Sequence, residues 1–281
     1  RIHSVSPIRQ ESSLLCTIIP KADIDQRWGH KKVNAPAVWA DNGKGSKDIV
    51  VAVMDTGVIY DHPDLKDNMI VLSADFYKNM GLTAPPASFD KSCGVWFHSN
   101  QETGKKLDPV AIGGSGIYAT TGGTSADINS TFEKMRVIGD IDGHGTHVAG
   151  IIGAAGNYAS KDVAAGINQD VTIMALNIFS KIKDEKGVYG TGAYDSDTFR
   201  AIDFLLSAKK IKKLNVKAVN MSFGGWSLVD GAYVSKIKAL SDADILVSIA
   251  SGNDGQNIDS PEGDFKGYLP IPAAIKTETS I

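Results

Sequence analysis

Four short apolar runs, rich in β-branched residues, recur along the chain at residues 49–54, 171–176, 216–221 and 245–250. Each is apolar at odd and even positions alike, as expected for a strand covered on both faces of a sheet. Helix-like stretches separate these runs, at residues 146–155, 195–214 and 230–242. In the second of them, Ala201, Leu205, Ala208 and Ile211 recur at spacings of three and four. The alternation predicts an α/β fold, a mostly parallel sheet with helices on both faces.

Two segments depart from this alternation. The first residues lack a clear period, and we interpret residues 1–21 as an irregular N-terminal arm. Residues 73–139 are rich in Gly, Ser, Thr, Asn and Pro, and so long a loop-rich span is uncommon within a domain. We therefore expect one domain over residues 22–281, with a surface insertion at 73–139 that has some structure of its own.

Composition narrows the class of protein. Apolar residues make up 42% of the chain and charged residues 22%, which excludes a disordered or fibrous chain. The 29 basic and 32 acidic side chains leave no basic excess for nucleic acid. The longest apolar run is six residues, where a membrane span needs about 20. We therefore expect neither a nucleic-acid partner nor a membrane span.

The two cysteines, Cys16 and Cys93, form no disulfide framework and no C-x-x-C pair. One bridge between them and two free thiols are both compatible with the sequence. We expect free, inert thiols, because no second feature marks a reactive site.

Asp55 directly follows the first predicted strand and precedes Thr56 and Gly57. In a parallel α/β sheet, catalytic groups gather where the strands end. An isolated Asp at this place more often forms a turn or caps a helix. Asp55 therefore needs a partner before a catalytic role follows.

His144 is the candidate partner. Gly143 and Gly145 flank it, and it lies where a helix is predicted to begin. The helix dipole there should favour a neutral imidazole, the form that a general base needs. His147, three residues later, leaves open a metal pair on one helix face, although the H-x-x-H spacing lacks the Glu of zinc protease motifs. We otherwise expect His147 to serve helix packing.

Asn253 lies in Ser251-Gly252-Asn253-Asp254-Gly255, just after the fourth predicted strand. Alone, this segment is typical of a turn. Beside Asp55 and His144, the Asn amide could donate to an oxygen that becomes negative during acyl transfer.

The motifs Asp-Thr-Gly at Asp55, His-Gly-Thr-His-Val-Ala-Gly at His144, Asn-Met-Ser-Phe-Gly-Gly at Asn220 and Ser-Gly-Asn-Asp-Gly at Ser251 resemble the successive signatures of the subtilisin-like serine proteases, the subtilases. Their order and their strand and helix contexts match the family. The resemblance implies a subtilisin-like fold, here truncated at its C-terminus, and a serine endopeptidase that cleaves extended or unfolded protein or peptide substrates. Residues 1–21 would then be a propeptide remnant or an extension.

The resemblance also implies roles for individual residues. Asp55 would orient His144, His144 would be the general base, and Asn253 would be the oxyanion donor. Two backbone edges and a pocket wall would bind an extended substrate as an added strand. The implied substrate-binding residues are Gly190, Thr191, Gly192, Ser222, Phe223, Gly224, Ala250, Ser251 and Gly252.

The family's nucleophile is missing. Its Gly-Thr-Ser-Met-Ala-x-Pro segment would follow Asn253, and nothing similar does. Gly123-Thr124-Ser125-Ala126 echoes the motif but precedes His144 and lacks the Ala-x-Pro continuation. We therefore expect the serine beyond Ile281, in a remaining C-terminal part or a second chain, and expect this chain alone to be inactive.

The resemblance implies a structural calcium ion as well. Asp64 follows Asp61-His62-Pro63, and its companions would be Ala155, Asn157, Asp162 and Ala164. Carboxylates, amides and carbonyls are the oxygen ligands that calcium prefers, although an ordinary polar turn would look the same. The family also suggests a secreted, cell-surface or periplasmic protein.

Two other functions stay open. One is an inactive subtilase relative that binds peptides or acts as a scaffold. The other is a metal-dependent hydrolase that uses His144 and His147.

Overall fold

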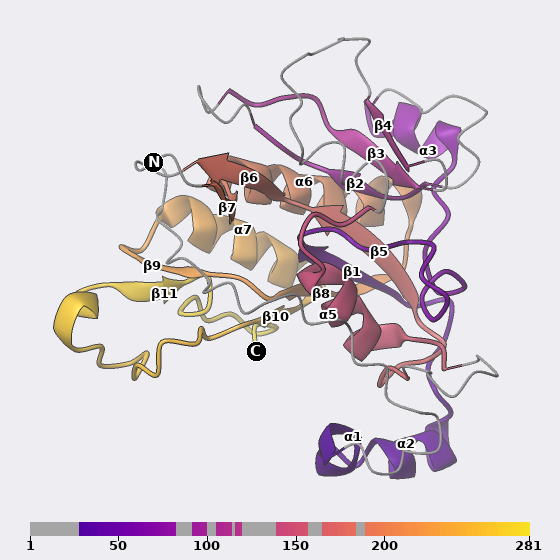
Figure 1. Ribbon diagram of the computed structural model, residues 1–281, viewed down its shortest axis with the longest axis horizontal. Helices are drawn as coiled ribbons and strands as arrows, with labels where there is room; N and C mark the ends of the chain where they lie inside the picture. The colour runs from indigo at the N-terminus through magenta and orange to yellow at the C-terminus, as the bar shows by residue number, and fades with distance from the viewer. Residues whose placement is uncertain are drawn as a thin grey trace.

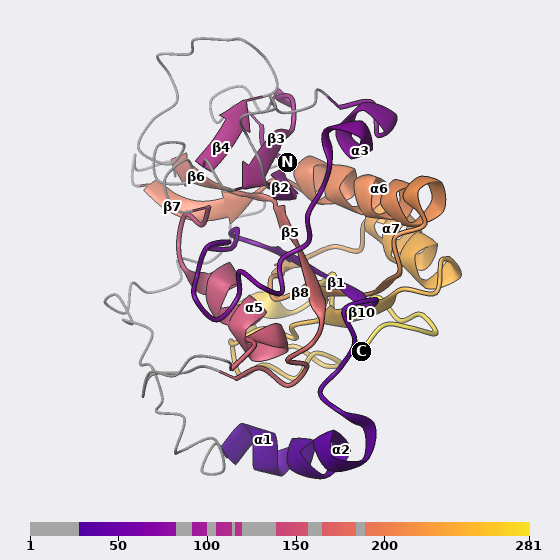
Figure 2. The same ribbon diagram turned by 90° about the vertical axis from the view of Figure 1, so that its right-hand side faces the viewer.

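A computed structural model describes residues 28–82, 92–99, 105–113, 116–119, 139–156, 165–183 and 189–281 (Figures 1 and 2). The arm at residues 1–21 lies outside these ranges, and its boundary stays a prediction. None of the helices described combines the length and the apolar character needed to cross a bilayer. The helices are α1 (Trp28–Lys32), α2 (Ala35–Asn42), α3 (Ala74–Asn79), α5 (His144–Gly153), α6 (Asp195–Lys212), α7 (Gly231–Asp242) and the 3-10 helix η2 (Gly263–Phe265).

Seven strands form one sheet in the order β10-β8-β1-β5-β2-β3-β4. The pairs from β10 to β2 are parallel, and β3 and β4 extend the sheet as antiparallel strands. The α/β prediction is confirmed, and the four predicted strands match β1, β5, β8 and β10 closely. The sheet strands are β1 (Val50–Asp55), β2 (Ser92–Trp96), β3 (Val110–Gly113), β4 (Gly116–Ala119), β5 (Thr172–Asn177), β8 (Val216–Met221) and β10 (Leu246–Ile249).

Two antiparallel strand pairs lie outside this sheet. One joins β6 (Phe179–Lys183) to β7 (Tyr189–Ala193), and the other joins β9 (Gly225–Ser227) to β11 (Leu269–Ile271). Both follow strands of the main sheet, so they lie near the end of the sheet where β5 and β8 finish.

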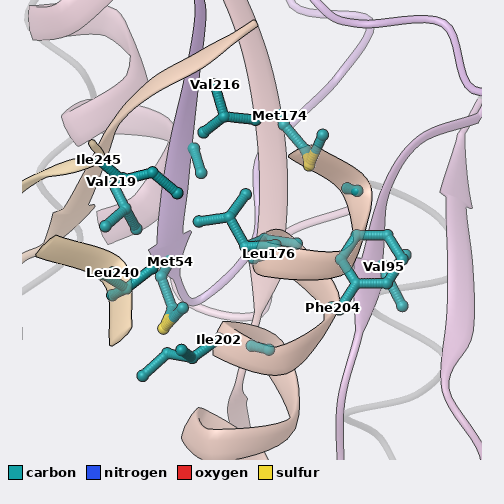
Figure 3. Packing of buried hydrophobic residues seen from close by; sticks show 14 of the residues in the cluster. Met54, Val95, Met174, Leu176, Ile202, Phe204, Val216, Val219, Leu240 and Ile245 are labelled. Carbon is teal, nitrogen blue, oxygen red and sulfur yellow. The ribbon is translucent and has the colours of Figure 1, made fainter. Parts of the chain in front are cut away.

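Helices cover both faces of the sheet, which agrees with the burial of its central strands at odd and even positions alike. Met54 and Leu176 belong to the core beneath α6 and α7, which lie together on one side (Figures 2 and 3). Val53 and Ala175, one residue earlier in each strand, belong to the core beneath α5 on the other side. Successive side chains of a strand point to opposite faces, so apolar residues at odd and at even positions pack into two separate cores.

One residue of the predicted apolar face of α6 lies elsewhere. Ala201, Leu205 and Ala208 are fully buried, whereas Ile211 is 57% exposed. At about 100° per residue, Ile211 is rotated about 80° from Ala201, beyond the stripe that the other two share. The prediction for Ile211 was wrong because three-residue steps accumulate rotation in one direction.

The span 73–139 was expected to be a surface insertion, but part of it belongs to the sheet. β2 is buried along its whole length and pairs in parallel with β5. Cys93 on β2 is a free thiol at 3% exposure, and burial raises its pKa, as expected of an inert cysteine. Cys16 lies outside the described residues. The sequence argument missed β2 because Ser92 and Gly94 interrupt the apolar character of a strand of only five residues.

Candidate active site

The carboxyl ends of the parallel strands bring several predicted site residues to one edge of the sheet. Asp55 is the last residue of β1, which lies between β8 and β5. Residues 222–224 follow β8, and residues 250–252 follow β10, the next strand outward. Because the strands run parallel, the segments that follow them leave the sheet at the same end.

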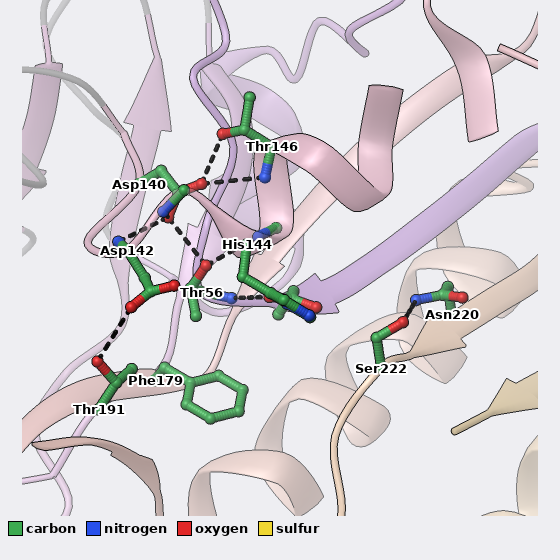
Figure 4. Close-up of polar contacts among 12 residues, drawn as sticks. Thr56, Asp140, Asp142, His144, Thr146, Phe179, Thr191, Asn220 and Ser222 are labelled. Carbon is green, nitrogen blue, oxygen red and sulfur yellow. Dashed lines mark hydrogen bonds and ion pairs between the residues drawn. The ribbon is translucent and has the colours of Figure 1, made fainter. Parts of the chain in front are cut away.

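His144, the first residue of α5 (Figure 4), is hydrogen-bonded to Asp55. Its Nδ1–H donates to Oδ1 of Asp55 over 2.8 Å. The Asp55 side chain is 1% exposed and that of His144 is 48% exposed. The contact fixes the tautomer with the proton on Nδ1. Among the described residues Nε2 of His144 has no hydrogen-bond partner, so it is available as a base.

The hydrogen bond that His144 donates to Asp55 raises the pKa of His144 above its ordinary value, against the opposing effect of burial. The charges of Asp55, Asp142 and Asp140 raise this pKa further. The expectation that the helix start would favour the neutral imidazole was therefore wrong in direction. A carboxylate in hydrogen-bond contact outweighs the partial charge of a helix end.

The two glycines beside His144 serve different purposes. Gly143 caps α5 with φ at 102°, in the region that favours glycine. Gly145 is needed for space, since a Cβ there would lie 2.1 Å from the carbonyl oxygen of Gly57 and 3.1 Å from Cβ of Asp55. Close approach of α5 to the end of β1 thus depends on a residue without a side chain.

Sequence reasoning missed three residues that surround the pair. Thr56, Asp140 and Thr146 form a hydrogen-bonded network between the end of β1 and the start of α5 (Figure 4). The available signal was Asp140, four residues before His144, since Asp commonly accepts backbone N–H groups at a helix start.

The predicted substrate residues 190–192 form the middle of β7. Thr191 donates from its hydroxyl to Oδ2 of Asp142 over 3.4 Å, which links β7 to the loop before His144. The ring of Phe179, at the start of β6, lies 5.8 Å from that of Phe223 in an edge-on arrangement. The β6–β7 hairpin is therefore in contact with both neighbouring parts of the sheet edge.

The segment expected to form a pocket wall is exposed. Ala250 joins β8 through its backbone N–H, and Gly252 adopts φ of 97°. Asn253 is also exposed, which leaves its amide open to solvent. The next residue, Asp254, accepts a hydrogen bond of 2.7 Å from Nε1 of Trp226, a contact that the sequence did not indicate.

No serine hydroxyl is hydrogen-bonded to His144 among the described residues. The hydroxyl of Ser222 accepts from Nδ2 of Asn220 over 2.8 Å (Figure 4). Ser251 is exposed. Ser125 lies outside the described residues.

The candidate calcium residues are only partly described. Asp64 is 5% exposed, and its carbonyl oxygen accepts the backbone N–H of Ala155 over 2.8 Å. The other expected ligands, Asn157, Asp162 and Ala164, lie outside the described residues. The buried carboxylate of Asp64 is of the oxygen type that calcium takes.

The alternative metal pair has less support. In the part of the chain that the structure describes, no group of three or more His, Cys, Asp or Glu residues could hold a metal ion. Nδ1 of His144 is occupied by Asp55. His147 is exposed, so the expectation that it serves helix packing was wrong. The second histidine lies one turn along α5, on its solvent side.

Two known proteases are similar to this chain in sequence. The major intracellular serine protease of Bacillus subtilis is 27% identical over 88% of this chain and 54% of its own length. The intracellular serine protease of Paenibacillus polymyxa is 27% identical over 82% of this chain and 49% of its own length. This chain thus spans about half the length of these two relatives.

Two solved structures are also similar, the S41 psychrophilic protease at 21% identity and Sphericase at 19%. Each has a TM-score of 0.49 and covers 88% of this chain, which covers 57% of each. The family described as the subtilase family matches residues 46–276, a range that contains Asp55, His144 and Asn253. This chain therefore belongs to the subtilase family.

Proposed function

We propose that this chain carries the acid and the base of a serine endopeptidase. The observation that supports the proposal is the hydrogen bond of 2.8 Å between Nδ1 of His144 and the buried carboxylate of Asp55. It joins an oriented imidazole to a carboxylate that stabilises its protonated form. Nε2 then faces outward as the atom that exchanges protons with substrate and nucleophile.

In the proposed reaction, a serine hydroxyl gives its proton to Nε2 of His144 while its oxygen bonds to the scissile carbonyl carbon. The protonated His144 then gives that proton to the leaving amine as the C–N bond breaks, and water releases the acyl group by the same steps. Asn253 would donate to the carbonyl oxygen while it is negative. Asp55 keeps its charge throughout and stabilises the imidazolium.

We place the nucleophilic serine outside these 281 residues. The Gly-Thr-Ser-x-Ala-x-Pro pattern is nowhere in the sequence, and the described serines make no hydrogen bond to His144. The serine would come from a C-terminal part of a longer protein, in line with relatives about twice as long.

The proposed substrate is an extended segment of a protein. Residues 190–192 offer a strand, and residues 222–224 offer a second backbone segment beside it, connected by the contact between Phe179 and Phe223. A substrate added as a strand would satisfy its backbone groups on both sides. Residues 250–252 would then border the side chain before the scissile bond.

A structural calcium ion is part of the proposal. Asp64 and Ala155 would contribute a carboxylate and a carbonyl, with the remaining oxygens from the 157–164 segment. The ion would tie that segment to the turn after β1 and take no part in the chemistry.

Secretion, expected from the family, is not supported by the two relatives named as intracellular proteases. Fractionation of the producing cells would show whether this protein is secreted or intracellular.

The test uses the product of the full gene and a casein-like unfolded substrate, with a fluorophosphonate probe for reactive serine. Asp55→Asn should lower turnover on the order of 10⁴-fold, as in serine proteases of another fold, because the wrong imidazole tautomer becomes favoured. His144→Gln should abolish probe labelling, while His147→Gln, at an exposed position of the same helix, should retain it. The 281-residue chain alone should not be labelled.

Two results would contradict the proposal. Unchanged turnover in Asp55→Asn would show that Asp55 does not orient or stabilise the catalytic imidazole. Tight peptide binding by the full-length protein without hydrolysis or labelling would identify an inactive relative that binds peptides.

A further inference from the structure

The buried carboxylate of Asp140 has no place in the mechanism above, yet it contacts both parts of the site. Its side chain is 0% exposed. A buried carboxylate is unfavourable unless hydrogen bonds replace its water. Asp140 receives five such bonds from described residues, and all of them come from two segments, the end of β1 and the start of α5.

The oxygens of Asp140 divide these donors between them (Figure 4). Oδ1 accepts from the backbone N–H groups of Asp142 and Gly143 at 3.0 Å each and from the Thr56 hydroxyl at 2.9 Å. Oδ2 accepts from the backbone N–H of Thr146 at 3.0 Å and from its hydroxyl at 2.5 Å. These contacts hold the residues on both sides of His144.

Thr56 and Thr146 extend the network in the opposite direction. The Thr56 hydroxyl accepts the backbone N–H of Gly145 over 2.9 Å, and Thr56 directly follows Asp55. The Thr146 hydroxyl accepts the backbone N–H of Ile59 over 2.9 Å. Each hydroxyl therefore donates to Asp140 and accepts from the other segment, so both connect α5 to the turn after β1.

Only a carboxylate suits this position. All five contacts are donors, and a carboxylate is an acceptor at both oxygens. An asparagine would direct its NH₂ group at donors on one side and leave them unsatisfied in a buried place. The charge also lies at the N-terminus of α5, where the helix dipole favours a negative group.

From this geometry we propose that Asp140 is a positioning residue that sets His144 in register with Asp55, an inference that rests on the proposed function of that pair. Asp140 touches neither substrate nor reacting atoms. It fixes the backbone at positions 142, 143 and 146 against Thr56, and the His144 ring follows. Without it, α5 could still form, but the distance from Nδ1 to Asp55 would no longer be constrained.

The experiment observes the ring proton on Nδ1 of His144 by NMR, in the 281-residue chain labelled with ¹⁵N-histidine. Only six histidines contribute, and His144→Gln assigns the signal. In the unmutated chain this proton should be shifted downfield and protected from solvent exchange. Asp140→Asn should make this proton exchange about tenfold faster or broaden its signal beyond detection, because a tenfold change corresponds to the loss of about one hydrogen bond.

Asp142→Asn is the matched control, because it removes an exposed carboxylate close to His144 without touching the network's acceptor atoms. It should keep the protected proton. If Asp140→Asn, folded by circular dichroism, keeps the proton as the control does, the inference is overturned.

A second pair of variants covers the case in which Asp140→Asn does not fold. Thr56→Val removes the connecting hydroxyl and should expose the ring proton, and Thr56→Ser restores the hydroxyl and should protect it again. Equal protection in both Thr56 variants would overturn the connection. A purely structural role would lower the melting temperature of both variants without separating them in this signal.

The readout needs no turnover, so it separates the inference from the proposed function. If the full-length protein does not hydrolyse substrate but the protection of the ring proton depends on Asp140, only the proposed protease function is refuted. If the full-length protein hydrolyses substrate but the protection of the ring proton does not change in Asp140→Asn, only the positioning role is refuted.

Discussion

Replacing Asp55 with asparagine should destabilise the fold more in mild acid than in alkali. In the folded chain the pKa of His144 is raised by its hydrogen bond to Asp55. Its unfolded pKa is about 6.5. The stabilisation from the charged pair is therefore fully present below about pH 6.5 and is lost as pH rises through the folded pKa.

The magnitude follows from the exposure of the two partners. A hydrogen bond to a charged group contributes about 1.5–3 kcal/mol when both groups are shielded from water. The His144 side chain is 48% exposed, so solvent screening reduces this to about 1 kcal/mol. The loss caused by Asp55→Asn should thus be about 1 kcal/mol larger at about pH 5.5 than at about pH 9.

Urea denaturation of the unmutated chain and of Asp55→Asn at both pH values measures this difference. Comparing two pH values cancels the pH-independent effects of placing an asparagine in a buried site. In a His144→Gln background the difference should disappear, because no imidazole remains to titrate. An equal loss at both pH values, or the same pH dependence without His144, would refute the reasoning.

Three further predictions concern other parts of the fold. Calcium should raise the melting temperature and a chelator should lower it, with a gain in stability of about 2.7 kcal/mol at a hundredfold excess of calcium over Kd. Asp64→Asn should abolish this response, and Asp67→Asn, at an exposed position, should keep it. Identical melting curves with calcium and with chelator would contradict the proposed calcium site. Gly145→Ala should destabilise the chain by about 1–3 kcal/mol, because the new Cβ would collide with the backbone of Gly57. Gly150→Ala, on the same helix but with open space around it, should be neutral or stabilising. Equal urea midpoints for the two variants would contradict the close approach of α5 to the end of β1. Leu176→Ala should lower the free energy of unfolding by about 2–5 kcal/mol, since the side chain is fully buried between β5 and α6, and a loss below about 1 kcal/mol in urea would argue against that packing.

Sequence alone determined the central strands and the order of the chemical groups. Apolar runs at both parities identify strands with two covered faces, because only such strands bury every side chain. Asp55 and His144 were identifiable because short motifs around them require particular residue types. His144 at a helix start also followed from local signals, since Gly143 and the apolar period of α5 lie within a few residues of it.

The tertiary structure decided what depends on contacts between distant segments. β2 joins the sheet through β5, about 80 residues away in the chain, and no local pattern records that pairing. The pKa direction of His144 depends on a carboxylate 89 positions earlier, which local dipole reasoning omitted. Sequence reasoning missed Asp140 because its donors, Thr56 and the start of α5, come together only in the folded chain. Local propensity and period are short-range properties, whereas burial and hydrogen bonding across the fold are set by the whole chain.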